Sequence, residues 1–314
     1  GYHHAVRMAR AAATGLGVSE EQVLVASTGV IGEPLPVERI EQALPALIAS
    51  LSPDGVADFA EAIMTTDRVP KVVSRQVEIG GACVTVTGVV KGAGMIRPDV
   101  ATMLCFLMTD ARVSPGLLRD TLTAGAERSF NRVTVDGDTS TNDTILLLAS
   151  GRSGVGVEDP AARAAFQRIL DEVMLALAKW MVKDAEGSNK LVEISVGGAV
   201  SDSDARRIAD TIAHSPLVKT ALFGEDANWG RILAAAGRAG AALDPIRVDI
   251  FIGPVQMVSK GIGCGKEAEA AATRVLKTDE FSITVDLHLG TGRAAVYTCD
   301  LSLDYVKINA DYRS

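Results

Sequence analysis

The chain has 314 residues, of which 47% are apolar and only 4% are aromatic, and its formal net charge is −8. This acidic balance argues against a nucleic-acid partner or an anionic membrane surface, because both are bound mainly through clustered Lys and Arg. No apolar run approaches the ~20 residues that a membrane-spanning helix needs. We therefore expect a globular protein with an aliphatic core, located in the cytoplasm and acting on small molecules.

The first half of the chain predicts helices and strands in alternation. An amphipathic helix at the start has Ala5, Met8 and Ala12 on one face. The apolar patterns then predict a strand over 23–26, helices over 37–51 and 56–64, strands over 72–79 and 83–90, a strand after Thr102, a helix over 115–130 and a strand near Val133. The pair Gly80-Gly81 between two strand-like runs is typical of a hairpin turn.

The second half continues the alternation. It predicts helices over 161–182, 202–214 and 267–276, an Ala-rich helix after Arg231, and strands over 191–196, 246–252, 282–289 and 294–299. Ser201 or Asp202 would cap the helix that begins at residue 202. These elements indicate a layered α/β fold with a second, smaller α/β domain. We place the boundary near Val200, which gives a catalytic domain over 1–200 and a C-terminal domain over 201–314.

A single hydroxyl group stands out at Thr102, within the stretch KGAGMIRPDVATMLCFLMTDA. A Gly-rich loop runs there through Ala101-Thr102 into an apolar, strand-like run. If the Thr102 hydroxyl cleaved the Ala101-Thr102 bond, the new α-amine could serve as a built-in base for that hydroxyl. The alternative is a Thr that merely starts a strand.

Two other sites would suit an acyl-transfer nucleophile. Ser27-Thr28-Gly29 could supply backbone N–H groups and a hydroxyl to a developing oxyanion, although the same residues would also form an ordinary polar turn. Glu186 lies in a Gly-bounded loop that suits a carboxylate meeting an ammonium group, or else it is a solvated residue at a helix end. The four histidines form no triad pattern with a serine: His3, His4, His214 and His288.

Metal and disulfide chemistry are not expected, and we predict no cofactor. The loop DGDTSTNDT has alternating acidic and hydroxyl side chains, but its Gly stands at the second position and no Glu closes it as a calcium loop requires. The cysteines show no CxxC spacing and are expected to be free thiols: Cys83, Cys105, Cys264 and Cys299.

A set of motifs in one order resembles a known family. The motifs are STGVIG, IMTTD, KGAGM-x-x-P-D-x-ATML with TDA seven residues beyond the Thr, DGDTSTNDT, DAEG, SPLVKTA, DANWGR and the terminal NADYRS. Together they resemble the bifunctional ornithine acetyltransferase/glutamate N-acetyltransferase family of arginine biosynthesis, over the whole of residues 1–314.

The resemblance implies a proenzyme that cleaves itself between Ala101 and Thr102 into α and β chains. Thr102 would take an acetyl group from N-acetylornithine and pass it to glutamate. Thr28 and Gly29 would form the oxyanion hole. The substrate-binding residues implied by the motifs are Thr65, Lys91, Thr102, Glu186, Asn309 and Ser314. Family members form a layered α/β sandwich and assemble as (αβ)₂ or larger.

Three points remain expectations at this level. Family members carry a further N-terminal segment before the position of Gly1, so we expect that part of the α chain precedes it. The main acetyl donor is expected to be N-acetylornithine, with acetyl-CoA used weakly or not at all, because the nearest phosphate-loop lookalike at 152–156 leads into acidic residues. Two alternatives are an aminopeptidase or amidase with the same nucleophile, and a non-enzymatic relative that never cleaves.

Overall fold

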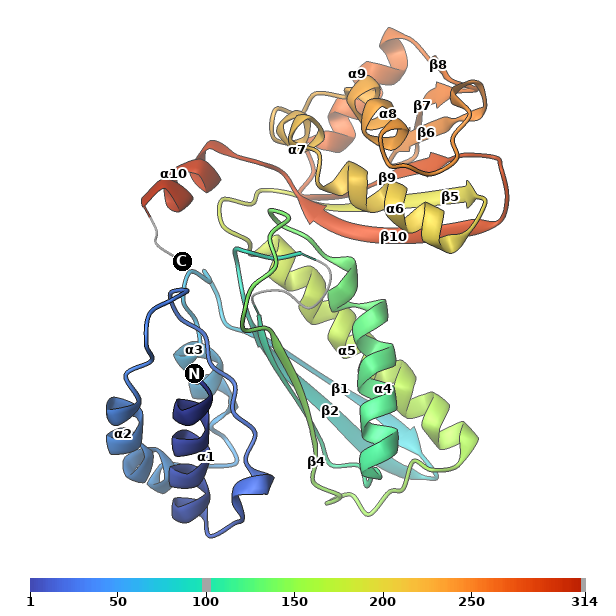
Figure 1. The fold of residues 1–314 in the computed structure, drawn as a ribbon. Coiled ribbons are helices and arrows are strands. Elements are labelled where there is room, and N and C mark those ends of the chain that lie inside the picture. The colour runs from blue at the N-terminus through green and yellow to red at the C-terminus, as the bar shows by residue number, and fades with distance from the viewer. Residues whose placement is uncertain (98–102, 312–314) are drawn as a thin grey trace.

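Two β-sheets with covering helices make up the protein, one sheet toward each end of the molecule (Figure 1). The computed structural model describes residues 1–97 and 103–311. The expected layered mixed α/β fold is confirmed by this arrangement.

The first sheet has four strands in the order β1-β2-β3-β4. Its strands are β1 (Lys71–Ile79), β2 (Ala82–Lys91), β3 (Leu104–Thr109) and β4 (Thr144–Ala149). Strand β2 is antiparallel to both β1 and β3, whereas β3 and β4 are parallel. Gly80 and Gly81 join β1 to β2 with φ values of 61° and 81°, a left-handed conformation that glycine adopts without strain. The predicted hairpin is therefore confirmed.

Helices lie on both sides of this sheet (Figure 1). On one side are α4 (Pro115–Arg128) and α5 (Pro160–Lys183), and on the other are α1 (Tyr2–Leu16), α2 (Val37–Ala49) and α3 (Val56–Ala62). The long helix α5 buries Phe166, Leu170, Val173 and Leu177 against the sheet, at the spacing that places side chains on one helical face. Two short 3₁₀ helices cover Glu20–Gln22 and Phe130–Arg132.

The second sheet has six strands in the order β10-β5-β9-β6-β7-β8. Its strands are β5 (Leu191–Ala199), β6 (Asp249–Ile252), β7 (Val255–Ser259), β8 (Ile262–Gly263), β9 (Glu280–Asp286) and β10 (Gly292–Cys299). Its helices are α6 (Asp202–Ala213), α7 (Pro216–Phe223), α8 (Trp229–Gly237) and α9 (Lys266–Leu276), with a 3₁₀ turn over Pro245–Arg247. Ser201 caps α6 by accepting a hydrogen bond from the amide of Asp204. Strand β5 pairs in this second sheet, although it lies before the boundary that we placed near residue 200.

Two predicted strands are wrong. Residues 23–26 form no strand, and no strand of the described residues pairs with them. Near Val133 there is only a single bridge, to Tyr297 of β10. Local apolar patterning does not make a strand without a neighbour to receive its backbone hydrogen bonds.

The bridge between Val133 and Tyr297 brings the two halves of the molecule together. The amide of Thr134 also donates to the carbonyl of Tyr297, at 2.9 Å. After β10, helix α10 (Leu303–Asp311) turns back toward the first sheet (Figure 1). The C-terminal helix therefore meets loops of the first half of the chain.

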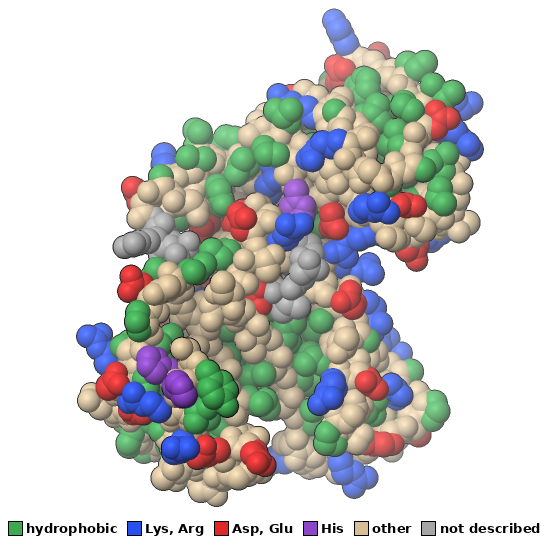
Figure 2. All heavy atoms as spheres, viewed as in Figure 1, with side chains coloured by type: hydrophobic (Ala, Val, Ile, Leu, Met, Phe, Trp, Pro, Cys, Tyr) green, Lys and Arg blue, Asp and Glu red, His purple; other side chains and the backbone are tan. Residues whose placement is uncertain are grey.

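On the face seen in Figure 2, Lys and Arg side chains are scattered among Asp and Glu and do not gather in one patch. A nucleic-acid site is normally a continuous basic surface. This face gives no support for one.

Candidate active site

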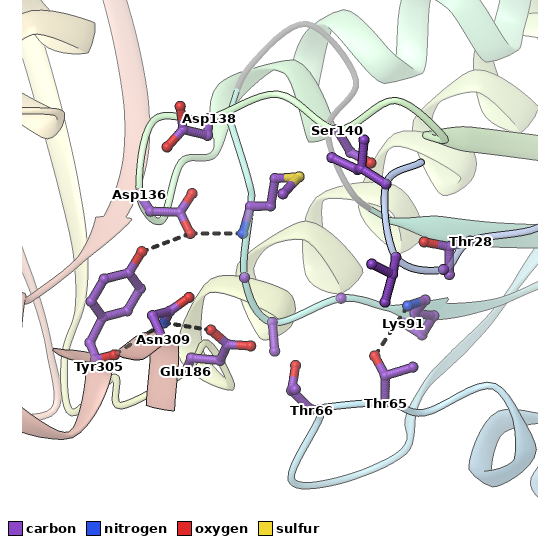
Figure 3. A pocket seen from close by; sticks show the side chains of 17 residues that line it. Thr28, Thr65, Thr66, Lys91, Asp136, Asp138, Ser140, Glu186, Tyr305 and Asn309 are labelled. Carbon is purple, nitrogen blue, oxygen red and sulfur yellow. Dashed lines mark hydrogen bonds between the residues drawn. The ribbon is translucent and has the colours of Figure 1, made fainter. Parts of the chain in front are cut away.

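A cavity of about 340 Å³ lies where α10 meets the loops of the first half (Figure 3). Its wall comes from the loops at 28–31, 65–66 and 136–140, the stretch 91–95 that leaves β2, Glu186 after α5, and Tyr305 and Asn309 of α10. A volume near 300 Å³ is at the small end of ligand pockets and suits a molecule of amino-acid size.

One end of the cavity carries a buried cation, Lys91, the last residue of β2. The side chain is only 4% exposed, and its ammonium donates to Thr65 Oγ1 at 3.2 Å. Burial lowers the pKa of Lys91, attraction by Asp67 opposes this, and repulsion by Lys71 adds to it. Within the described residues no carboxylate forms an ion pair with Lys91, so its charge is available to an anionic group.

The other end carries a buried carboxylate, Glu186, which is 7% exposed. Its backbone amide donates to the carbonyl of Ala93 at 3.0 Å, which fixes the loop after α5 against the stretch that leaves β2. Gly94 faces the carboxylate so closely that a Cβ there would lie 2.6 Å from Oε2. Asn309 Nδ2 donates to Oε2 at 2.9 Å. No hydrogen bond of a described residue reaches Oε1, so this oxygen can accept from a ligand.

Helix α10 is held in place by a second contact, between Tyr305 and Asp136. The Tyr305 hydroxyl donates to Asp136 Oδ2 at 3.2 Å, and the amides of Met95 and Ile96 donate to the same carboxylate at 2.7 and 2.9 Å. Burial raises the pKa of Asp136, against these hydrogen bonds, and burial also raises the pKa of Tyr305. Asp136 therefore joins α10 to the segment that leads toward residue 98.

Thr28 and Gly29 both line the cavity, and Thr28 lies on the same side as Lys91 (Figure 3). They lie in an irregular segment, and no hydrogen bond between described residues uses the Thr28 hydroxyl or the two backbone amides. Free donors at a cavity wall can stabilise an oxyanion.

The chain matches the model of the ArgJ family over residues 1–314. The chain belongs to this family. It is 54% identical over 301 residues to the arginine biosynthesis bifunctional protein ArgJ of Geobacter sulfurreducens, covering 95% of this chain and 77% of that protein. It is 50% identical over 312 residues to the protein of the same name from Rhizobium meliloti, covering 98% of this chain and 76% of that protein.

A solved structure gives the same assignment. The crystal structure of the arginine biosynthesis bifunctional protein ArgJ from Bacillus halodurans is similar to this fold with a TM-score of 0.63 and 41% sequence identity. The match covers 66% of this chain and 98% of that one. The layered α/β architecture is thus that of an ArgJ-family structure.

Six of the residues expected from the ArgJ-like motifs line the single cavity described above: Thr28, Gly29, Thr65, Lys91, Glu186 and Asn309. They come from segments far apart in the sequence. Ala101 and Thr102 of the expected cleavage point, and Ser314 of the tail, lie outside the described residues.

The described residue next to the expected cleavage point is held by Asp143. The amide of Met103 donates to Asp143 Oδ1 at 2.7 Å, while the buried Oδ2 has no hydrogen-bond partner among the described residues. Burial raises the pKa of Asp143 to about 7. The loop DGDTSTNDT thus contributes a carboxylate at each end, Asp136 beside the cavity and Asp143 at the start of β3.

Sequence reasoning missed the supporting residues Asp67, Asp136, Asp143 and Tyr305. Of these, Asp67 lies within the motif IMTTD, and Asp136 and Asp143 lie within DGDTSTNDT, which was the available signal. Among residues 1–97 and 103–311, no group of three His, Cys, Asp or Glu side chains could hold a metal ion. In the same residues no helix is both long enough and apolar enough to cross a membrane.

Proposed function

We propose that this chain transfers an acetyl group from N2-acetyl-L-ornithine to L-glutamate in arginine biosynthesis, through an acetyl-Thr102 intermediate. The observation that carries the proposal is a cavity of amino-acid size in a member of the ArgJ family, with a buried carboxylate at one end and, at the other, a buried cation that forms no ion pair with a described residue. Lys91 would bind the substrate α-carboxylate. Glu186 would hold its ammonium group.

Maturation would precede transfer. The Thr102 hydroxyl attacks the carbonyl carbon of Ala101, the peptide C–N bond breaks, and an ester forms between Ala101 and the Thr102 oxygen. Water hydrolyses this ester, which leaves a carboxylate on Ala101 and a free α-amine on Thr102. The α and β chains would remain together, because the described elements before and after the cleavage point share one core.

Transfer would then follow in two half-reactions. The α-amine of Thr102 takes the proton of its own hydroxyl as the oxygen attacks the acetyl carbonyl. Thr28 and Gly29 donate hydrogen bonds to the oxyanion, and collapse breaks the C–N bond as the proton passes to the leaving nitrogen of ornithine. The amine of glutamate reverses these steps on the acetyl-Thr102 ester.

The proposal extends to donor, assembly and location. We expect N-acetylornithine to be the main donor, because the described residues that line the cavity include neither a basic cluster nor a Gly-rich helix start for a pyrophosphate. We further propose an (αβ)₂ or larger assembly in the cytoplasm, with no cofactor.

Product analysis tests the proposal. The purified protein is incubated with N-acetylornithine, with and without glutamate, and acetylglutamate, ornithine and acetate are quantified. Equal amounts of acetylglutamate and ornithine are expected, with Thr102→Ala inactive. Release of acetate without acetylglutamate would contradict it in favour of an amidase, and comparable kcat/KM for acetyl-CoA would contradict the donor assignment.

A further inference from the structure

Beneath the Lys91 end of the cavity lies a second buried lysine that no step of the reaction uses. The side chain of Lys71 is 0% exposed and lies between two carboxylates. Its ammonium is 2.6 Å from Asp67 Oδ1 and 2.6 Å from Asp184 Oδ2. A fully buried cation persists only where partners compensate its desolvation, and here two carboxylates do so.

Asp67 also holds the backbone on which the Lys91 end is built. Its Oδ1 accepts from the amide of Gly92 at 2.8 Å and its Oδ2 accepts from the amide of Thr65 at 3.1 Å. The Asp67 carboxylate therefore fixes Gly92, which follows Lys91, and Thr65, whose hydroxyl accepts a hydrogen bond from Lys91. These bonds, with the Lys71 ion pair, hold the pKa of Asp67 below its usual value although burial opposes them.

The two lysines compete for the same carboxylate. Asp67 attracts Lys91 but forms its ion pair with Lys71, and the hydrogen bond that the Lys91 ammonium makes within the described residues goes to the neutral hydroxyl of Thr65. We infer that Lys71 is a positioning residue for substrate binding: by occupying Asp67, it prevents an internal ion pair between Asp67 and Lys91 and so keeps the charge of Lys91 available for the substrate carboxylate.

Removal of Lys71 should reverse this competition. Asp67 would lose the cation with which it forms its ion pair, and Lys91, which Asp67 already attracts, could take that place. A substrate carboxylate would then have to displace Asp67 from Lys91. Weaker substrate binding with little change in the chemical step is the expected consequence.

The inference rests on the proposed role of Lys91, and the experiment separates the two. In Lys71→Met, KM for N-acetylornithine is expected to rise roughly tenfold or more, with kcat changed less than about threefold. The reason is that a carboxylate close to Lys91 strongly stabilises its ammonium and so competes with the substrate carboxylate. Asp184→Asn is the matched control: it removes the other partner of Lys71 and should lower thermal stability while KM stays unchanged.

If Lys91→Met leaves KM unchanged, the proposed function of the site fails. If Lys91→Met raises KM and Lys71→Met does not, this inference fails.

A double variant and a pH profile exclude a merely structural effect. Lys71→Met combined with Asp67→Asn removes the competitor as well, so KM should return toward the wild-type value. Substrate binding through Lys91 is lost as pH rises through the lowered pKa of Lys91. Removal of Lys71 removes its repulsion of the Lys91 ammonium, which raises the pKa of Lys91. The alkaline limb of 1/KM should therefore move to higher pH in Lys71→Met. An unmoved limb, or a double variant no better than the single one, would overturn the inference.

If Lys71→Met does not fold, Asp67→Asn alone decides the matter. It removes the attraction on Lys91 and leaves Lys71 with Asp184. The alkaline limb should then move to lower pH, and a limb that stays in place contradicts the competition.

Discussion

The two ends of the cavity are built in different ways. The Lys91 end is supported by residues close in sequence, Thr65, Asp67 and Lys71, which join β1 to β2 through a buried ion-pair network. The Glu186 end depends on contacts between distant segments, with Asn309 123 positions away and the Tyr305–Asp136 pair separated by 169 positions. The cationic end is therefore built mainly from the β1–β2 hairpin and the segment before it, with Asp184 as a distant partner of Lys71, whereas Glu186 at the carboxylate end also depends on the docking of α10.

Because of this difference, two contributions to substrate affinity can be measured separately: the charge of a side chain and the docking of helix α10. At the Lys91 end, binding depends on which carboxylate the lysine meets. At the Glu186 end, it depends on a charge and also on how firmly α10 is held. Variants at the second end should therefore divide into those that remove the charge and those that loosen the helix.

The largest effect is expected from Glu186→Gln. Its carboxylate is buried, and a substrate ammonium left there without a partner typically costs about 2–5 kcal/mol. We expect kcat/KM for N-acetylornithine to fall by roughly 30-fold or more, with self-cleavage unaffected. Glu172→Gln, an exposed glutamate on α5, is the control and should leave kcat/KM unchanged. Wild-type kinetics in Glu186→Gln would remove Glu186 from the substrate site.

A smaller effect is expected from Tyr305→Phe, which removes the hydroxyl that donates to Asp136 and keeps the ring. The loss of one hydrogen bond costs about 0.5–1.5 kcal/mol. KM should rise several-fold through looser docking of α10, and the melting temperature should fall by a few degrees. Tyr2→Phe, at an 80% exposed tyrosine, serves as control. If Tyr305→Phe behaves like Tyr2→Phe, the docking of α10 does not limit binding and the contrast between the two ends is wrong.

The same difference between local and long-range contacts determines how much of the structure could be predicted from the sequence alone. The long helix α5, the Gly80-Gly81 hairpin and the cap at Ser201 follow local rules, and the structure confirms each of them. The cavity residues were expected through ordered motifs that resemble a family. Their convergence on one cavity is a result of the fold, because no local pattern relates Glu186 to Asn309.

What the sequence did not reveal depends on pairing across long distances. Strand β4 is a short apolar run whose identity is fixed by its parallel partner β3, and it was not predicted. Helices α7 and α10 are short and were also missed. The ion pairs of Lys71 could not be foreseen, because Asp184 lies beyond α5 and is far from Lys71 in the sequence.

The central claim is that Thr102 is freed by self-cleavage and carries the acetyl group. Intact-mass measurement of the purified protein, before and after mixing with N-acetylornithine in the absence of glutamate, tests it most directly. The account predicts two fragments that meet at Ala101-Thr102, with one acetyl group added to the fragment that begins at Thr102 and lost again when glutamate is supplied. A single uncut chain that produces acetylglutamate, or an acetyl group on the other fragment, would contradict the account.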